Sequence, residues 1–491
     1  MIFSHVLYQL SYLGTRGRKT RKTNAHYNMR DSSGPKVVRR LSRVALALIV
    51  FQMASGPHRF AQSGEPEPAQ RSRASMSTQR EGLVRADGRM LVDDGGPFLA
   101  LGATLFWALW GIEHDGERLA ANLETVRRGG FDYIRVLAVV GPGGWSDRTV
   151  DPRAANWAAN VSALTDLAYD RYGVRVQWTI FGGLDNTRTA ESRAAAVDRF
   201  LKAIDGRHHK VFAIEIANEG ERNGFSGPAG WAELKALASR VREAYGGLLA
   251  TTSPASLTCA AQSRLYAGAP ASLLTLHFPR SDDGKNTWQL LEQVSRTAAA
   301  PCRGLPRAMS SNEPIGPYSS VREERDPARL VTSAAFTWMS GIGAYVLHTG
   351  AGIRGGGVED RELGRPANLR DVDRWSGIAD GLGCVRRVLP RDLPAWHHRV
   401  EGDRRHPFSI GGTSPRRTAR GPHVAADEGK HFVMLLTDIR EPVTLTARVP
   451  AAFYAVEQLH CAVVLEQTVV QGDAIAVPTG HDALIIIGER H

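Results

Sequence analysis

The sequence contains few cysteines, and their spacing limits what they can do. Four occur among 491 residues, and no two of them form a C-x-x-C pair. This spacing argues against a zinc ribbon. One disulfide would suit an exported protein, but the sequence does not say which cysteines would pair. We therefore expect mostly buried, unpaired thiols at Cys259, Cys302, Cys384 and Cys461.

The apolar run near the N-terminus, V-A-L-A-L-I-V-F at 44–51, is too short to span a bilayer. Basic residues at 39–43 precede it, and the A-Q-S at 61–63 suits cleavage before Gly64. We interpret the segment as a bacterial-type signal peptide whose true start is Met1 or Met29. The prediction is a secreted or periplasmic protein without stable membrane insertion after cleavage. The alternative is a basic tail that contains a short buried segment.

The positive charge of the chain is confined to its beginning. The formal net charge is +11, but residues 1–64 hold eleven Lys/Arg and one acid, a net of +10. The remainder has 50 basic and 49 acidic residues, a net of +1. The body of the protein therefore lacks the basic surface of a nucleic-acid-binding protein, and we expect no nucleic acid partner.

Short apolar runs alternate with helical patterns through the middle of the chain, which predicts a parallel sheet. Eight such units over about 250 residues fit a (β/α)8 TIM barrel. A doubly wound sheet is the alternative, but no G-x-G-x-x-G follows the first strand. The predicted strands are 98–103, 132–138, 174–180, 211–217, 248–253, 272–277, 306–311 and 342–347, and the predicted helices are 117–128, 156–171, 190–204, 229–245, 286–298 and 326–340.

The pattern changes after residue 390. Residues 403–430 are rich in basic, Gly and Pro residues and read as a loop. Six short strands without intervening helices follow, which predicts a small antiparallel β-sandwich. The predicted organisation is a basic extension with signal peptide at 1–63, a linker at 64–80, the catalytic barrel at 81–390 and the C-terminal β-sandwich domain at 391–491.

Polar residues stand at the ends of several predicted barrel strands, where TIM barrels carry their chemistry. Two of them are glutamates that follow the fourth and seventh strands, and these should face each other across the barrel mouth. Cleavage of a glycosidic bond needs such a carboxyl pair, with one carboxyl protonated and the other ionised. The residues at the strand ends are Asn218, Glu219, His277, Asn312, Glu313 and His348, and the second predicted strand carries Arg135.

These motifs resemble those of glycoside hydrolase clan A, the cellulase-like (β/α)8 retaining hydrolases, over residues 83–350. The resemblance implies that Glu219 is the acid/base and Glu313 the nucleophile in hydrolysis of a β-linked glycan. It also implies that Asn218 bonds the sugar 2-hydroxyl and that Arg135 steadies the nucleophile, while His277 lines the cleft. The sequence departs from the clan pattern in H-F-P at 277–279, which lacks the usual tyrosine, and in L-H-T at 347–349, which lacks a tryptophan.

Further candidates for substrate binding are His348 and three tryptophans, because sugar rings pack on aromatic faces. Ordinary packing between helix and barrel is the alternative for Trp107, Trp110 and Trp145. We expect no metal and no cofactor, because clustered His/Asp ligands are missing from the strand ends. The alternative function is a non-catalytic glycan-binding TIM barrel.

Overall fold

The computed structural model describes residues 79–145, 148–254, 256–280, 287–299, 301–317, 324–354, 359–360, 365–366, 368–371, 375–400, 405–412 and 423–491. The predicted signal peptide and nearly all of the predicted linker lie outside these residues. In the described part of the chain, no helix is long and apolar enough to cross a membrane.

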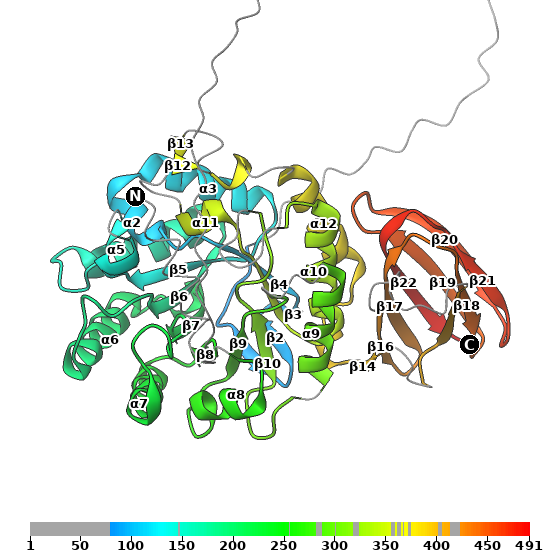
Figure 1. The fold of residues 1–491 in the computed structure, drawn as a ribbon. Helices are drawn as coiled ribbons and strands as arrows, with labels where there is room; N and C mark the ends of the chain where they lie inside the picture. The colour runs from blue at the N-terminus through cyan, green and yellow to red at the C-terminus, as the bar shows by residue number, and fades with distance from the viewer. Residues whose placement is uncertain are drawn as a thin grey trace, which may run out of the picture. The chain divides into compact units, whose positions relative to one another are not determined.

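Eight parallel strands form the barrel predicted from the sequence, in the order β8-β7-β6-β5-β4-β11-β10-β9 (Figure 1). Nearly continuous apolar runs form them because both faces of each strand are buried. Strands β8 and β9 meet where the Ser272 N–H donates to the Leu249 carbonyl at 2.8 Å, which closes the ring. The strands are β4 (Ala100–Thr104), β5 (Tyr133–Val139), β6 (Arg175–Phe181), β7 (Val211–Ala217), β8 (Leu248–Thr252), β9 (Leu273–Leu276), β10 (Ala308–Ser311) and β11 (Ala344–Leu347).

Helices surround the outside of this barrel (Figure 1), and each predicted helix is present. The principal ones are α2 (Ala108–His114), α3 (Gly116–Arg128), α5 (Trp157–Asp166), α6 (Ala190–Ile204), α7 (Gly227–Ala244), α8 (Cys259–Tyr266), α9 (Thr287–Ala299), α10 (Pro327–Met339) and α12 (Trp375–Val388). Shorter elements are α4 (Pro142–Trp145), α11 (Gly350–Arg354), η2 (Leu167–Arg171), η3 (His208–Lys210), η4 (Leu369–Asp371), η5 (Leu393–Ala395), β12 (Glu359–Asp360) and β13 (Arg365–Pro366).

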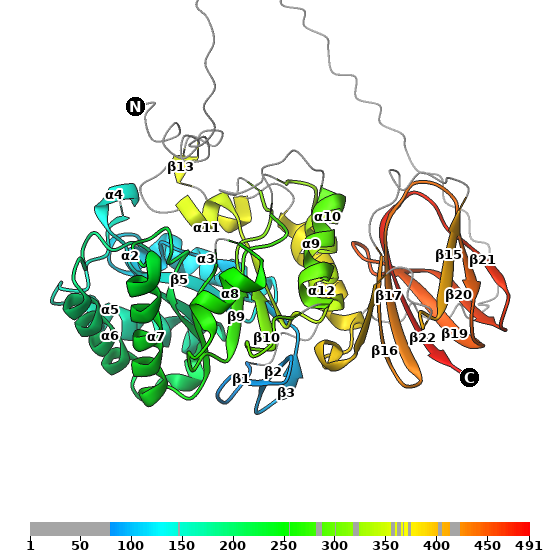
Figure 2. The ribbon, with the colours of Figure 1, turned by 60° about the horizontal axis from the view of Figure 1, so that its bottom comes forward.

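A small antiparallel sheet covers the amino-terminal end of the barrel strands, opposite α4 and α11 (Figure 2). It consists of β1 (Arg85–Asp87), β2 (Met90–Asp93) and β3 (Gly96–Phe98). Gly88, with φ +62°, lies in the hairpin turn that links β1 to β2. Apolar side chains of this sheet pack against those at the beginnings of the barrel strands in a separate buried cluster. This end is therefore closed, and the opposite end remains for the functional site.

The C-terminal residues form two antiparallel sheets, as predicted for a β-sandwich. The larger sheet has the order β14-β16-β17-β22-β19-β20 and the smaller one β15-β18-β21, with an apolar cluster of their own. Residues 403–430 were interpreted as a loop, but part of this segment is strand β16. It is extended because β16 pairs along its whole length with β17. The strands are β14 (His397–Val400), β15 (Phe408–Gly412), β16 (Val424–Glu428), β17 (His431–Ile439), β18 (Val443–Ala447), β19 (Ala451–Glu457), β20 (Ala462–Val469), β21 (Ala474–Val477) and β22 (His481–Arg490).

The prediction of mostly buried, unpaired thiols is wrong. Cys259 pairs with Cys302, and Cys384 pairs with Cys461, with Cα–Cα distances of 5.4 and 5.5 Å. Only Cys384 is fully buried. The partners are 43 and 77 positions apart, and the fold brings them together, which spacing along the chain does not reveal.

Candidate active site

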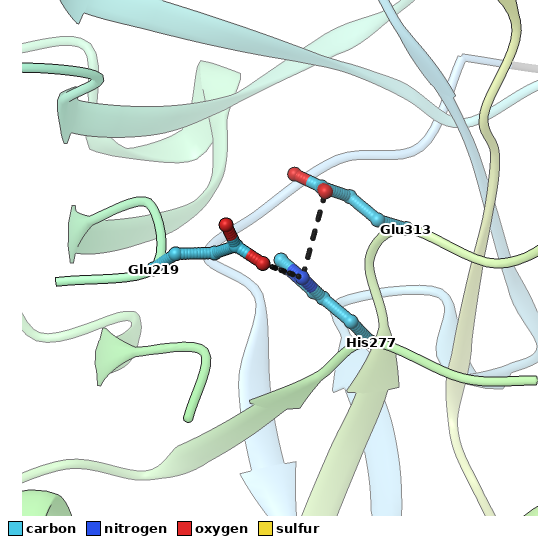
Figure 3. A group of neighbouring side chains, drawn as sticks. All are labelled: Glu219, His277 and Glu313. Atoms are coloured by element: carbon cyan, nitrogen blue, oxygen red, sulfur yellow. Dashed lines mark ion pairs between the residues drawn. The ribbon is translucent and has the colours of Figure 1, made fainter. Parts of the chain in front are cut away.

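Two glutamates and one histidine converge at the carboxyl ends of three barrel strands (Figure 3). Glu219 follows β7, His277 follows β9 and Glu313 follows β10. The His277 Nδ1 lies 3.4 Å from Glu219 Oε1 and 3.5 Å from Glu313 Oε2. An oxygen of one carboxylate lies within 4.8 Å of an oxygen of the other. The two glutamates predicted to face each other therefore do so, with the histidine between them.

The backbone at Glu219 is held in an uncommon conformation. Its φ of +39° is in the left-handed region, which costs a non-glycine residue roughly 1–3 kcal/mol. Neighbouring hydrogen bonds hold it there: the Gly220 N–H donates to the Thr252 hydroxyl at 2.7 Å, and the Asn223 N–H donates to the Glu219 carbonyl at 3.0 Å. These contacts turn the chain sharply after β7, so the carboxylate is directed toward Glu313 rather than along the strand.

The segment that carries Glu313 is anchored on two sides. The Asn312 N–H donates to the Leu276 carbonyl at 2.8 Å, and the Ile315 N–H donates to the Pro279 carbonyl at 3.1 Å. At Gly316 a β-carbon would lie 1.8 Å from the His348 carbonyl oxygen, so only glycine allows this approach to the end of β11. Glu313 is thus fixed against its neighbours, and its side chain is only 6% exposed.

Arg135 of β5 joins the predicted nucleophile to a second buried carboxylate. Its Nη1 donates to Glu313 at 2.8 Å, and its Nη2 donates to Glu215 at 2.8 Å and to the Asn218 side-chain oxygen at 2.9 Å. Arg135 therefore pairs both with an interior glutamate and with the glutamate of the site. Glu215 also accepts hydrogen bonds from the hydroxyl groups of Thr179, Ser253 and Thr275.

Asn218 is half-buried, and the contact with Arg135 fixes the direction of its amide. Among the described residues, nothing accepts a hydrogen bond from its side-chain nitrogen. The amide N–H groups are therefore available to a ligand hydroxyl, as the predicted contact with a sugar 2-hydroxyl requires.

His348 lies beneath the site rather than in an open cleft. The side chain is fully buried after β11, with Nδ1 2.9 Å from the Thr104 hydroxyl and the ring edge-on to Phe106. Burial lowers the pKa of His348 to about 3, although the charge of Glu313 opposes this shift. The structure does not support the prediction that His348 contacts substrate, because its side chain is fully buried and its Nδ1 lies within hydrogen-bonding distance of Thr104.

Arg280 is a member of the site that the sequence analysis did not select. It lies beyond β9, three residues after His277. Its Nη1 is 3.0 Å from Glu219 Oε1, 3.7 Å from Glu313 Oε2 and 2.6 Å from His277 Nδ1. One nitrogen of this guanidinium thus touches both glutamates and the histidine.

The surrounding charges set the protonation of both carboxyls. Burial raises the pKa of Glu219, but the hydrogen bond and charge of His277 and the charge of Arg280 outweigh burial, and the result is about 2. Burial likewise raises the pKa of Glu313, and His277, His348, Arg135 and Arg280 lower it well below the usual range. Both glutamates are therefore ionised at neutral pH in this structure.

The same three side chains have the composition of a metal site. One ligand atom each from Glu219, His277 and Glu313 lie within 4.8 Å of one another. Arg280 already supplies a positive charge among them, however, and its Nη1 is in hydrogen-bonding distance of the histidine nitrogen that a metal would use. The donor set therefore fits a protein cation better than a metal ion.

The predicted aromatic platform is not formed by Trp107. Its side chain is 1% exposed, its indole N–H donates to the Ala351 carbonyl, and Arg118 lies 4.5 Å above the ring. Trp107 therefore packs inside the protein, which was the alternative to a role in sugar binding. Trp110 is half-buried, and the centroid of its ring lies 4.9 Å from that of His114 on the same helix. Trp145 is the last residue of α4, and its side chain lies outside the described part of the structure.

Two residues of the site, Glu215 and Arg280, were not predicted, and only Glu215 left a signal in the sequence. Glu215 stands inside an apolar strand, where a charge must be paired once it is buried. Arg135 stands in the same kind of position on β5, so the two could have been matched as a pair. Arg280 follows the departure H-F-P, and a lone arginine in a loop gives no indication of where it points.

No protein-family model matches this sequence, and no curated protein matches it. Solved structures, in contrast, match it closely in shape. One described as a glycoside hydrolase has a TM-score of 0.60 at 11% identity, over 83% of this chain and 97% of that one. A glycoside hydrolase family 5 protein from Bacteroides vulgatus has a TM-score of 0.60 at 12% identity, over 83% of this chain and 93% of that one. A putative glycoside hydrolase from the same organism has a TM-score of 0.55 at 14% identity, over 83% of this chain and 82% of that one. This chain therefore has the barrel-and-sandwich fold of these glycoside hydrolases.

Proposed function

We propose that this protein is a retaining glycoside hydrolase of clan A that cleaves β-linked glycosidic bonds. The observation that carries the proposal is the pair of glutamates, with oxygens within 4.8 Å, at the ends of β7 and β10. Retaining enzymes hold their two carboxyls about 5–5.5 Å apart, whereas inverting enzymes leave about 6.5–9.5 Å for a water molecule. The short separation favours direct attack by one carboxylate.

The contacts of the two glutamates divide the roles between them. Glu313 is buried, ionised and held by Arg135, which suits a nucleophile that attacks the anomeric carbon. Glu219 is the more exposed of the two and suits proton transfer to the leaving oxygen. The Asn218 amide is adjacent and would donate to the sugar 2-hydroxyl.

The mutual repulsion of the carboxylates would drive the proton cycle. The charge of Glu313 raises the pKa of Glu219, so protonation of Glu219 is easiest while Glu313 is ionised. Once Glu313 is esterified by the sugar its charge disappears, the pKa of Glu219 falls, and Glu219 acts as a base toward water. The pKa of Glu219 is about 2 in this structure, so Glu219 has to take up a proton when substrate binds.

Export from the cytoplasm belongs to this proposal. Two disulfides are present in the described residues, and disulfides persist in oxidising compartments. They support a secreted or periplasmic enzyme whose mature form begins near Gly64.

The proposal is tested with Glu219→Ala and a panel of aryl β-glycosides and β-glycans. For substrates with poor leaving groups, kcat/KM is expected to fall about 10²- to 10⁴-fold, because these need a general acid. For 2,4-dinitrophenyl glycosides, the first step should be almost unaffected. Azide should then restore turnover and give a β-glycosyl azide, which proton NMR identifies.

Several results would contradict the proposal. An α-configured azide product would mean that azide displaces the leaving group directly, so that Glu219 rather than Glu313 would be the missing nucleophile. Equal loss on all leaving groups would remove Glu219 from the acid role. Binding of glycans without any cleavage by the wild type would favour the non-catalytic glycan-binding barrel.

A further inference from the structure

One edge of the Arg280 guanidinium has no hydrogen-bond partner among the described residues. All the side-chain contacts that Arg280 makes with described residues involve Nη1. Within that part of the chain, Nη2 and Nε donate to no protein atom, and neither belongs to the buried atoms that lack a partner. This open Nε–Nη2 edge presents two parallel N–H groups, the geometry that binds a carboxylate or a sulfate with two hydrogen bonds.

Arg280 is also more accessible than the two glutamates and the histidine that it contacts. Its side chain is 19% exposed, against 12% for Glu219, 6% for Glu313 and 4% for His277. A sugar that places its anomeric carbon between the glutamates would have to contact this arginine. Glu219 and Glu313 meanwhile hold Nη1, so the open edge is already oriented before a ligand arrives.

The other arginine of the site serves a different purpose. Arg135 is fully buried, and both of its terminal nitrogens are occupied by Glu313, Glu215 and Asn218. It already neutralises interior carboxylates and is out of reach of a ligand. Arg222 is 40% exposed and lies 3.6 Å from Glu219. Arg280 differs from both arginines because it is accessible and its Nη1 is paired with both glutamates.

We propose that the Nε–Nη2 edge of Arg280 binds an anionic substituent of the sugar that lies between Glu219 and Glu313. This inference rests on the proposed function and specifies its substrate class: a β-glycan with a uronic acid or a sulfated sugar at the cleaved position. Arg280 is then a specificity-determining residue, because a neutral sugar leaves the open edge unsatisfied.

Anion binding at Arg280 would also favour protonation of Glu219, the general acid. Arg280 helps to lower the pKa of Glu219, and an anion on the opposite edge of the guanidinium offsets part of that effect. The pKa of Glu219 would rise when the charged substrate is bound, so the proton needed by the leaving group is taken up with the correct substrate. Substrate choice and acid activation would share one residue.

The test compares 4-nitrophenyl β-D-glucuronide, β-D-glucoside and 6-sulfo-β-D-glucoside, together with the galacto series, on the wild type and on Arg280→Gln. We expect the wild type to favour an anionic substrate over its neutral counterpart by about 10- to 100-fold in kcat/KM, the value of a charged hydrogen-bonded pair. In Arg280→Gln the ratio should fall to about one, whereas Arg280→Lys should keep part of it. Preference for the glucuronide or for the sulfate ester identifies which anion is recognised.

The pH profile gives a readout that a purely structural role would not change. Arg280 lowers the pKa of both glutamates, so its removal raises both. The kcat/KM profile of Arg280→Gln should therefore move to higher pH on both limbs. Arg264→Gln is the matched control, because this exposed arginine stacks on Trp231, away from the cluster, and its loss should shift neither the profile nor the ratio.

Calorimetric binding of D-glucuronate, D-galacturonate and the corresponding neutral sugars separates this inference from the proposed function. Acids that bind more tightly than neutral sugars, only when Arg280 is present, support the anion site even if no glycoside is cleaved. Cleavage of neutral glycosides, with no preference for acids in kinetics or in binding, overturns the anion site and leaves the hydrolase intact. An unchanged ratio in Arg280→Gln also overturns it.

Discussion

Replacing Glu313 with glutamine is expected to reduce hydrolysis of every cleaved substrate by at least about 1000-fold. The amide has the shape of the carboxylate, but it cannot attack the anomeric carbon, so the covalent intermediate does not form. The glutamine can still accept the 2.8 Å hydrogen bond from Arg135, so the fold should survive. Initial rates on the best substrate, with circular dichroism of the same samples, check this result.

The control for this experiment is Glu466→Gln, which removes the same charge from an exposed position on β20. Its activity should equal that of the wild type. If Glu313→Gln retained comparable activity while folded, Glu313 would not be the nucleophile. Mass spectrometry after reaction with a 2-deoxy-2-fluoro glycoside should place the trapped sugar on Glu313.

Replacing Arg135 with leucine is expected to lower the free energy of unfolding by about 3–5 kcal/mol, because it leaves buried carboxylates without their cation. Arg135 is fully buried and is the common partner of Glu215 and Glu313. The variant should also lose activity, since the pKa of Glu313 rises when the guanidinium is removed. Urea unfolding followed by tryptophan fluorescence measures the first effect.

Arg175→Leu provides a matched comparison at the closed end of the barrel. Arg175 is 2% exposed on β6, and its Nη1 lies 2.8 Å from Asp93. Its removal should destabilise the protein by a similar mechanism, yet the folded fraction should keep its turnover rate. A loss of less than 1 kcal/mol in Arg135→Leu would mean that the fold does not depend on this cation to hold the interior carboxylates.

The barrel was predictable because its signals are local. Each strand is an apolar run of a few residues, and each helix between them has an apolar face, so periodicity alone locates both. The sandwich strands β17–β22 gave the same kind of signal. Strands β14–β16 did not, because short segments such as V-A-A-D-E become strands only by pairing with a neighbour.

The candidate site was predictable in so far as it lies at strand ends. Glu219, Glu313, His277 and Asn218 meet because parallel strands bring their carboxyl ends to one edge. Arg135 reaches them from within β5. The predictions failed where they depended on the burial of a side chain or on contacts between distant parts of the chain. Whether Trp107 and His348 reach solvent depends on the chain packed over them, and the disulfide partners and Arg280 are brought into place by tertiary structure.

The Cys384–Cys461 disulfide has a consequence for proteolysis. One sulfur belongs to helix α12 beside the barrel, and the other lies between two strands of the sandwich. A protease that cuts once anywhere between these cysteines divides the polypeptide into two chains, but the bond still joins them. Such a nicked molecule would keep its full mass in a non-reducing gel, and the sandwich would separate from the barrel only when a nick and a reductant act together.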